Sequence, residues 1–548
     1  MSTEKVTGEA FARKASGLVR AVSPTGALLY NLSATTLYLT GIYACWMLYI
    51  APGADLISIA VIAAIGLLFG MFTYSQFAAS MPRSGGDYVY VGRTFGGPPA
   101  FVLSFAYTAM NLTWPALAMW FASVYGLSEG FMGLGLATGD QMMLNWGAFY
   151  GTPTGIFLVI VVANIVLAAA NILGWRTYFA ITKIAMVVSF ASAICILGVL
   201  LTSSHQQFVA VFNNFMTPLA NEPNYYDKVI SIAQGFGYSA AVPKLTLYST
   251  LVGINVILSY TGWSMFSTYI GGEIKQAKSL RVQLYAQVAC TVIVSSFLIV
   301  ITYLATSVFG YSFIGASSYL TYEHGDALPV FLPQGSLLFN TMLLVPSIPL
   351  GVLMTVGFAM WSFLYAICTV PFITRNFMAY SLDRVLPKIF SSVSVRYHTP
   401  AFMVSVAFVG ALLYGALISF TAFIHDAFLL YAMLIIPATL SWIVTGLAAV
   451  VFPFRTRSKP IFESSPIRNL RVGRIPFIAI SGAIWAVLAF VMLFIYLYEP
   501  IFGVVGNIYQ WIIPALYGFA IVVYLAARWY RRRTAISLDA TFREIPPE

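Results

Sequence analysis

Small polar residues interrupt a long apolar stretch near the middle of the chain, VGINVILSYTGWSMFSTYIGGE. The residues at its centre are Ser259, Tyr260, Thr261, Gly262 and Trp263. An unpaired amide in hydrocarbon is costly, so a spanning helix is broken only where the freed backbone lines a cavity. Freed amides and carbonyls of this kind can bind a polar solute. The alternative is that Gly and Ser allow two membrane helices to pack closely.

A second interruption occurs in the first apolar stretch, where the chain reads YNLSATTLY. Its central residues are Ser33, Ala34, Thr35 and Thr36. The two interrupted stretches are the first and sixth along the chain, which are corresponding positions of two five-helix repeats. Interruptions at matching positions indicate the solute site of secondary transporters, which favours a cavity over packing. Tyr107 and Asn111, four residues apart on one helix face, are expected to form walls of this cavity.

Groups that could carry catalysis are scarce. The 18 Asp and Glu residues occur singly, and the four His residues fall in predicted loops. A membrane-embedded transferase would need clustered carboxylates, His or a metal, so we expect neither enzymatic activity nor a cofactor. The apolar stretches carry no Asp, Glu or His at mid-depth, which favours a neutral solute over a cationic one. If sodium is coupled, oxygen atoms near Ser362 and the first interruption are its expected ligands.

The composition indicates what positions these residues. Of 548 residues, 60% are hydrophobic and 8% are charged, against about 25% charged in ordinary soluble domains. The mean hydropathy is +0.85. A span needs about 20 apolar residues, and that criterion predicts an all-α integral membrane protein with twelve spans. They are Gly26 to Ile50, Leu56 to Ser80, Ala100 to Tyr125, Gly155 to Leu173, Tyr178 to Leu201, Leu245 to Gly272, Gln283 to Phe309, Thr341 to Phe372, Ala401 to Phe420, Ala427 to Phe452, Phe477 to Tyr498 and Gly503 to Arg528.

The charge distribution predicts the orientation. With both termini in the cytoplasm, all of the 28 Lys and Arg residues except Lys228 and Lys244 lie in predicted inner segments. This asymmetry follows the positive-inside rule. The net charge of +10 therefore reports orientation in the cell membrane, and no nucleic-acid partner is expected.

Three loop motifs resemble a known family. The segment SMPRSGGDYVYVGRTFGGPPAF follows the second span, GGEIKQAKSLR follows the sixth, and TRNFMAYSLDRVLPKIFSSVSVRYHTPAF follows the eighth. The first and third closely resemble signatures of the amino acid-polyamine-organocation (APC) permeases. With the twelve spans, the resemblance extends over nearly the whole chain.

The resemblance implies two inverted five-helix repeats with broken first and sixth helices, which is the LeuT-type fold. The implied organisation is an inner segment 1–25, a first repeat 26–201, an outer loop 202–244, a second repeat 245–452, a basic inner loop 453–476, two peripheral spans in 477–528 and an inner tail 529–548. In this family the first break holds the carboxylate of an amino acid and the sixth takes its ammonium group. The positions here that match these breaks are Ser33 to Thr36 and Ser259 to Gly262, and Trp263 matches the aromatic residue that follows.

The chain also departs from the family pattern. Ser33 to Thr36 replace the Gly residues usual in the first break, and Ser189 lies where some proton-coupled members carry Lys. The coupling ion, H⁺ or Na⁺, is therefore left open. On the inner side, a gate closed by ion pairs is one interpretation of four charged residues, and solvated loop charges are the other. These residues are Arg83, Asp87, Glu273 and Arg375.

The function expected from the sequence is alternating-access transport of a neutral amino acid across the cell membrane. Its partners would be the amino acid, a coupling ion and membrane lipids. Two alternatives remain at this point. One is a transporter-like sensor that binds without transport, and the other is an exchanger of another small organic solute.

Overall fold

The computed structural model describes residues 18–35, 37–239, 242–328, 333–421, 427–502, 504–506, 508–533 and 538–542. This part of the chain is almost entirely helical. A single two-stranded hairpin, β1 (Arg471–Val472) with β2 (Ile475–Pro476), occurs in the loop predicted to be basic. Gly473 at its turn has φ of 58°, a left-handed conformation that glycine adopts without steric cost.

The helices of the first half alternate long spans with short connecting helices. They are α1 (Pro24–Thr35), α2 (Leu37–Ile50), α3 (Leu56–Ser80), α4 (Asp87–Thr94), α5 (Gly97–Asn111), α6 (Trp114–Phe121), the π-helix η1 (Ala122–Ser128), α7 (Glu129–Thr138), α8 (Gln141–Tyr150), α9 (Pro153–Ile172), α10 (Trp175–Thr202), α11 (His205–Ala220) and α12 (Tyr225–Gly235).

The second half continues in the same manner. Its helices are α13 (Leu247–Thr261), the 3₁₀ helix η2 (Gly262–Glu273), α14 (Leu280–Phe309), α15 (Tyr311–Glu323), η3 (Gly325–Ala327), α16 (Leu337–Leu343), α17 (Ile348–Leu382), η4 (Lys388–Ser391), α18 (Ala401–Phe420), α19 (Ala427–Val451), α20 (Lys459–Glu463), α21 (Phe477–Tyr498), η5 (Pro500–Phe502), η6 (Ile508–Trp511), α22 (Ile512–Arg533) and α23 (Leu538–Thr541).

Eight of these helices are long and apolar enough to cross a membrane, as judged from the described residues. They correspond to the predicted spans 2, 4, 5, 7, 8, 9, 11 and 12. The predicted spans 1, 3 and 6 are each divided between shorter helices, and the tenth falls on α19. The chain is thus a multi-pass membrane protein, and the total of twelve spans remains a prediction.

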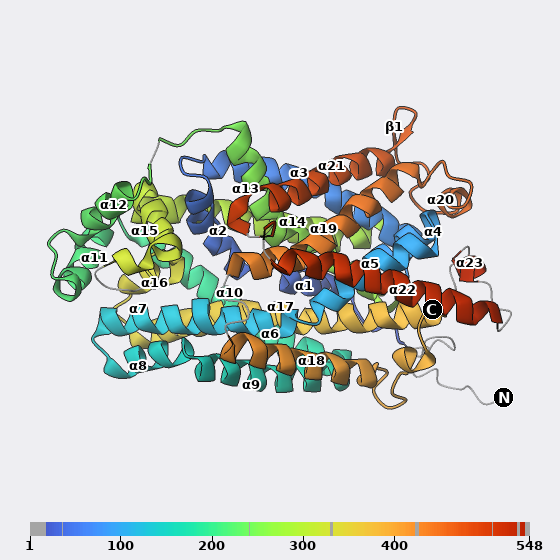
Figure 1. The fold of residues 1–548 in the computed structure, drawn as a ribbon, viewed down its shortest axis with the longest axis horizontal. Coiled ribbons are helices and arrows are strands. Elements are labelled where there is room, and N and C mark those ends of the chain that lie inside the picture. The colour runs from blue at the N-terminus through green and yellow to red at the C-terminus, as the bar shows by residue number, and fades with distance from the viewer. Residues whose placement is uncertain are drawn as a thin grey trace, which may run out of the picture.

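Counterpart spans of the two predicted repeats pack against each other. The second span α3 contacts the seventh span α14, and the fourth span α9 contacts the ninth span α18. Similarly, α1 contacts η2 and α6 contacts α17, which join the first span to the sixth and the third to the eighth. In Figure 1, α9 and α18 lie on one side of the molecule and α3 and α21 on the opposite side.

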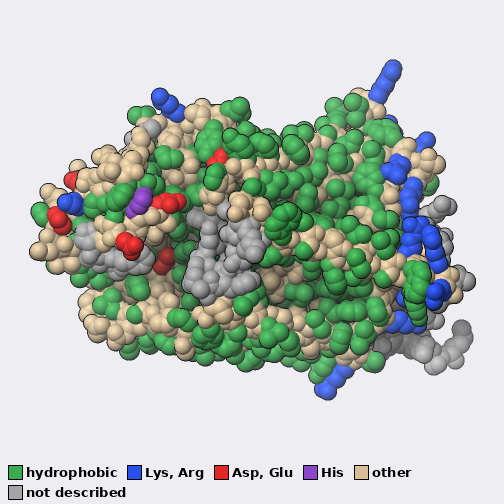
Figure 2. Space-filling model, in the orientation of Figure 1, with side chains coloured by type: hydrophobic (Ala, Val, Ile, Leu, Met, Phe, Trp, Pro, Cys, Tyr) green, Lys and Arg blue, Asp and Glu red, His purple; other side chains and the backbone are tan. Residues whose placement is uncertain are grey.

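Charged side chains gather at the two ends of the molecule. Figure 2 shows Lys and Arg at the end where α4, α20 and the last turn of α22 lie. Asp, Glu and His lie toward the opposite end, and a band of hydrophobic side chains separates the two. This distribution matches a membrane protein whose apolar belt faces lipid.

The end opposite the basic side chains is covered by helices. The predicted outer loop 202–244 contains α11 and α12, and the segment 310–340, between the predicted seventh and eighth spans, contains α15 and the start of α16. Aromatic rings join them: Tyr226 of α12 stacks on Phe313 of α15 with ring centroids 4.5 Å apart. Because α15 also packs on α2, this cover is joined to the first span.

Candidate functional site

The sixth span changes its geometry at Gly262. The α-helix α13 ends at Thr261, and η2 continues as a 3₁₀ helix of 12 residues, all of them buried. Such helices rarely exceed three or four residues, and a 3₁₀ stretch within a helix often marks a hinge. The predicted interruption therefore appears as a change of helix type at Gly262, with non-helical dihedral angles only at Ile270.

Aromatic rings from four spans meet at this change of geometry. Trp263 lies with its ring centroid 5.2 Å from Trp442 of α19 and 6.3 Å from Tyr107 of α5. Phe372 of α17 lies 4.9 Å from Tyr107. A Cβ atom added at Gly262 would lie 2.6 Å from Trp442, so glycine is required for this approach. The structure thus brings together Tyr107, Gly262 and Trp263 of the predicted site.

Asn31 joins the first span to η2. Its Nδ2 donates to the carbonyl oxygen of Ala286 at 2.9 Å, and its Oδ1 accepts from the amide of Ser267 at 2.7 Å. The neighbouring Tyr30 donates its hydroxyl to the carbonyl oxygen of Cys368 in α17 at 2.6 Å. Asn31 was not among the predicted site residues. An amide within an apolar run beside the interruption was the signal for it.

The other predicted residues of the first span turn back on their own helix. The hydroxyl of Ser33 donates to the carbonyl oxygen of Leu29, and that of Thr35 to Leu32. Ala34 is fully buried. Thr36 lies outside the described residues.

The predicted residues of the sixth span point in different directions. Ser259 shares a hydrogen bond of 2.5 Å with the hydroxyl of Tyr496 in α21, so its side chain faces the eleventh span. The Tyr260 ring lies 6.1 Å from Trp46 of α2. Thr261 donates to the carbonyl oxygen of Ile257 in its own helix. These side chains do not converge with those of Ser33 and Thr35.

Asn111 carries an unused acceptor. Its Nδ2 donates to the carbonyl oxygen of Tyr107 at 2.8 Å, whereas its buried Oδ1 accepts no hydrogen bond from any described residue. A buried acceptor without a partner is costly, so a donor on a bound solute would relieve that cost.

Ser362 is buried in α17, and the described residues form no cluster of three His, Cys, Asp or Glu side chains that would indicate a metal site.

Glu273 and Arg375 form a buried ion pair at the C-terminal end of the sixth span. Arg375 Nε donates to Glu273 Oε1 at 2.8 Å, and its Nη2 donates to Oε2 at 3.2 Å. Trp175 Nε1 donates to the same carboxylate at 2.7 Å, and the guanidinium lies 5.2 Å from the centre of that indole ring. The Glu273 carbonyl also accepts from the amide of Val22 at 3.0 Å. Spans 5, 6 and 8 are thereby joined to the segment preceding the first span.

A second buried network centres on Asp383, which follows α17. Arg83 Nη1 lies 3.0 Å from Asp383 Oδ1, and Arg93 Nη1 lies 2.8 Å from Oδ2. Burial alone would raise the pKa of Asp383, but the two guanidinium charges outweigh it and hold that pKa below its usual range. Asp383 was quoted in a sequence motif but was not expected as a partner of Arg83. The reason is that nothing in the local sequence indicates contacts between residues this far apart.

Asp87 is held by hydroxyl groups. It accepts from Tyr74 at 2.6 Å, from Tyr269 at 2.5 Å and from Thr445 at 2.9 Å. Within the part of the chain that the structure describes, no Lys or Arg forms an ion pair with it, because Arg83 and Arg93 are taken by Asp383. Burial raises the pKa of Asp87 even though these hydroxyl groups lower it. Of the four charged residues predicted at the inner side, Asp87 is thus held without an ion pair.

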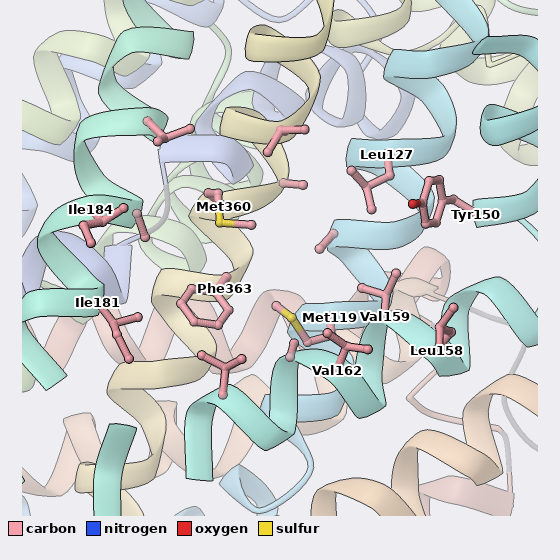
Figure 3. Close-up of a pocket in the computed structure, with 17 residues that line it drawn as sticks. Met119, Leu127, Tyr150, Leu158, Val159, Val162, Ile181, Ile184, Met360 and Phe363 are labelled. Atoms are coloured by element: carbon pink, nitrogen blue, oxygen red, sulfur yellow. The ribbon is translucent and has the colours of Figure 1, made fainter. Parts of the chain in front are cut away.

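A cavity of about 550 Å³ lies away from these residues, between the third, fourth, fifth and eighth spans (Figure 3). Met119, Val162, Ile184 and Phe363 point into it (Figure 3), and its lining is almost entirely apolar. Because an amino acid brings an ammonium and a carboxylate that need polar partners, this cavity does not suit one.

The family model for amino acid permeases matches residues 27–520. No curated protein matches the sequence.

Proposed function

The chain belongs to the amino acid permease family, and from this premise we propose that it moves a neutral amino acid across the cell membrane by alternating access. The family match over residues 27–520 is the observation that carries the proposal. Permeases are transporters rather than enzymes, so the family supports transport of an amino acid. The neutral class of the substrate, the coupling to H⁺ or Na⁺ and the cytoplasmic position of both termini belong to the proposal.

The proposed substrate site lies where the first and sixth spans meet the third. The residues predicted for this site are Ser33, Ala34, Thr35, Thr36, Tyr107, Asn111, Ser259, Tyr260, Thr261, Gly262 and Trp263. The unused Oδ1 of Asn111 and the rings of Tyr107 and Trp263 support this position, because together they offer one acceptor and an apolar wall. Such a wall favours an apolar or aromatic side chain on the substrate.

The proposed inner gate consists of Arg83, Asp87, Glu273 and Arg375, with Asp383 added as the partner of Arg83. The ion pairs and hydrogen bonds of these residues connect the sixth span to the fifth, eighth and tenth. Alternating access requires such contacts between moving and static spans to break once in each cycle.

Uptake of labelled amino acids into proteoliposomes tests the proposal, with an imposed sodium gradient, a proton gradient, or neither. We expect a neutral amino acid to accumulate under one gradient. Gly262→Leu should abolish uptake, since any side chain at that position meets Trp442. Gly198→Leu is the matched control, because a Cβ at Gly198 in α10 meets no atom within 4 Å. Size-exclusion chromatography verifies that both variants fold.

Two results would contradict the proposed transport. Folded protein that takes up no amino acid under any gradient would refute transport of an amino acid. Binding of an amino acid without uptake would instead favour a sensor.

A further inference from the structure

Glu129 is a buried carboxylic acid at the end opposite the inner gate. It is the first residue of α7, four positions beyond the predicted end of the third span, and its exposed fraction is 9%. The part of the cover formed by α15 and α16 lies beside α7 at this end (Figure 1). Neither the proposed substrate site nor the inner gate uses this residue.

The Glu129 side chain borders a small cavity between the first span and the cover. The cavity has a volume of about 50 Å³, enough for a water molecule. Cys45 of α2, Tyr322 of α15, Ser336 and Phe358 of α17 also line it. Ser336 donates its hydroxyl to Glu129 Oε2, and the same hydroxyl oxygen accepts from the amide of Phe339 at 3.2 Å. The serine is therefore oriented as a donor toward the carboxyl group.

No positive charge faces this group within the described residues. The titratable groups that line the cavity beside Glu129 are the Cys45 thiol, the Tyr125 phenol of η1 and the Tyr322 phenol. The elements α8 and α16 contain no charged residue, and the single Arg of α17 lies at its inner end. No Lys, Arg or His of the described part of the chain forms an ion pair with Glu129.

A carboxyl group in this position is stable only in its neutral, protonated form. Burial of an unpaired charge is far costlier than burial of a hydrogen-bonded acid, so such a group binds a proton instead. Accordingly, burial raises the pKa of Glu129 to about 8, and the Ser336 hydroxyl opposes this only in part. When the cover moves away and water reaches the side chain, the pKa returns toward about 4.3, the value for an exposed Glu.

The cavity is connected to the proposed substrate site. Tyr322, which lines it, accepts a hydrogen bond of 2.8 Å from Trp46 Nε1. The Trp46 ring in turn lies 6.1 Å from Tyr260 of the sixth span. Tyr49, which lies in α2 with Trp46, donates its hydroxyl to Glu323 of α15, so α2 and the cover are joined at a second point. Closure of the cover and the position of the sixth span are thus linked by direct contacts.

We propose that Glu129 is a proton-binding site that must be filled for the cover of α15 and α16 to close over the substrate path. The carboxylate takes one proton from the outer solution as the cover closes and releases it when the cover opens. The role of this site in transport rests on the proposed function. If the site acts in this way, H⁺ is the ion that closure of the cover requires.

The pH dependence has a definite sign. The closed state has the higher pKa, so closure is most favourable below about pH 4.3 and weakens about tenfold for each pH unit up to about 8. Above about pH 8 it changes no further. Glu129→Gln, which imitates the protonated acid, should remove this dependence and hold the cover closed at every pH.

Labelling of Cys45 tests this directly, because its thiol lines the cavity and its exposed fraction is 6%. Cys195, Cys290 and Cys368 are replaced by Ala in all proteins, which are placed in lipid nanodiscs and treated with a maleimide from pH 5.5 to pH 8. The reactivity of the thiol itself changes with pH, so each rate is divided by that of Glu129→Gln at the same pH. We expect a ratio near one at pH 5.5, rising to at least about tenfold at pH 8.

Glu222→Gln is the matched control, because this carboxylate is 38% exposed and pairs with Lys228. Its labelling should follow that of the unaltered protein. If Glu129→Gln does not fold, Ser336→Ala provides a second measurement. Loss of the donor makes the buried carboxylate less stable, so labelling should continue to rise above pH 8.

Equal pH profiles for Glu129→Gln and the unaltered protein would overturn the proposal. The result is independent of the uptake assay. If Cys45 labelling follows Glu129 but no amino acid is taken up, the proton site stands and the proposed function fails. If an amino acid is taken up but Cys45 labelling is the same with and without Glu129, the proposed function stands and the proton site fails.

Discussion

The Arg375 side chain makes several interactions at the end of the molecule that is predicted to be inner. Its guanidinium donates two hydrogen bonds to Glu273 and stacks on Trp175, with both charged groups almost fully buried. Removal of one partner from a buried pair leaves an uncompensated charge, which costs about 3–5 kcal/mol. The pair is therefore strong only while both members are present.

A charge swap tests this pair. Glu273→Arg and Arg375→Glu should each abolish uptake and lower the melting temperature, because each places like charges together in a buried position. The double variant should recover part of both. Recovery is incomplete because Trp175 Nε1 donates only and loses its acceptor. The measurement is uptake together with thermal unfolding in detergent.

The exposed pair Lys459–Glu463 serves as the control for the swap. Its side chains are 56% and 62% exposed, so exchanging them should change stability by less than about 1 kcal/mol. Independent, additive effects of the two inner substitutions would contradict a direct pair.

At the residue scale, the sequence predicts some partners and misses others. Glu273 and Arg375 were placed on the inner side from charge and motif, and the structure joins them. Arg83 was expected in the same group, but its partner Asp383 is 300 positions away. Glu129 was not singled out because an isolated Glu after a span resembles any loop charge. Burial, which only the folded chain reveals, distinguishes it.

At the scale of elements, the turn before α4 positions η2. Gly85 donates its amide to the carbonyl oxygen of Tyr269 at 3.1 Å, and Ser84 accepts from the amide of Gly272 at 3.2 Å. Gly86 has φ of 46°, and a Cβ there would lie 2.5 Å from the Tyr269 ring. The glycines thus provide both a left-handed backbone and room for the sixth span.

Comparison of Gly86→Ala with Gly139→Ala separates these two contributions. Both glycines have positive φ, so each substitution strains the backbone: the cost is about 1–2 kcal/mol at Gly139, which is in the αL conformation, and larger at Gly86, whose ψ of −123° lies outside that region. Gly139 has no atom within 4 Å of an added Cβ, whereas Gly86 meets Tyr269, which holds Asp87. We expect Gly86→Ala to lower the melting temperature further and to reduce uptake. Equal shifts for both variants would show that the Tyr269 contact is unimportant.

Element boundaries follow the sequence where polar or proline residues limit an apolar run. The predicted spans Leu56 to Ser80, Ala401 to Phe420 and Phe477 to Tyr498 coincide with α3, α18 and α21. The predicted interruption coincides with the change of helix type at Gly262, but the 3₁₀ geometry depends on partners elsewhere, such as Asn31. The π-helix η1 lies at the predicted end of the third span, and no feature of the sequence was recognised as predicting it.

At the scale of the whole molecule, the C-terminal segment contacts the buried network around Asp383. Phe542 is fully buried, and its ring lies 5.8 Å from Tyr88 and 5.4 Å from the Arg93 guanidinium. Gly92 and Gly97 leave the space that the ring occupies. The tail was predicted only as an inner segment, 529–548, because its short sequence carries no periodic pattern that would indicate docking.

Phe542→Ala should destabilise the folded protein by about 3–5 kcal/mol, as expected for loss of a buried aromatic ring. Phe490→Ala is the control, since that side chain is 59% exposed on α21. Thermal unfolding in detergent measures the difference. A shift no larger than that of the control would show that the tail does not stabilise the inner side.

The 12 residues of η2 are longer as a 3₁₀ helix than they would be as an α-helix. A 3₁₀ helix rises about 2.0 Å per residue and an α-helix about 1.5 Å, so rewinding this stretch would shorten it by roughly 6 Å. The Glu273–Arg375 bond of 2.8 Å cannot survive such a retraction. If the sixth span moves during transport, the winding of this helix would therefore set both how far its C-terminal end can move and whether the ion pair breaks.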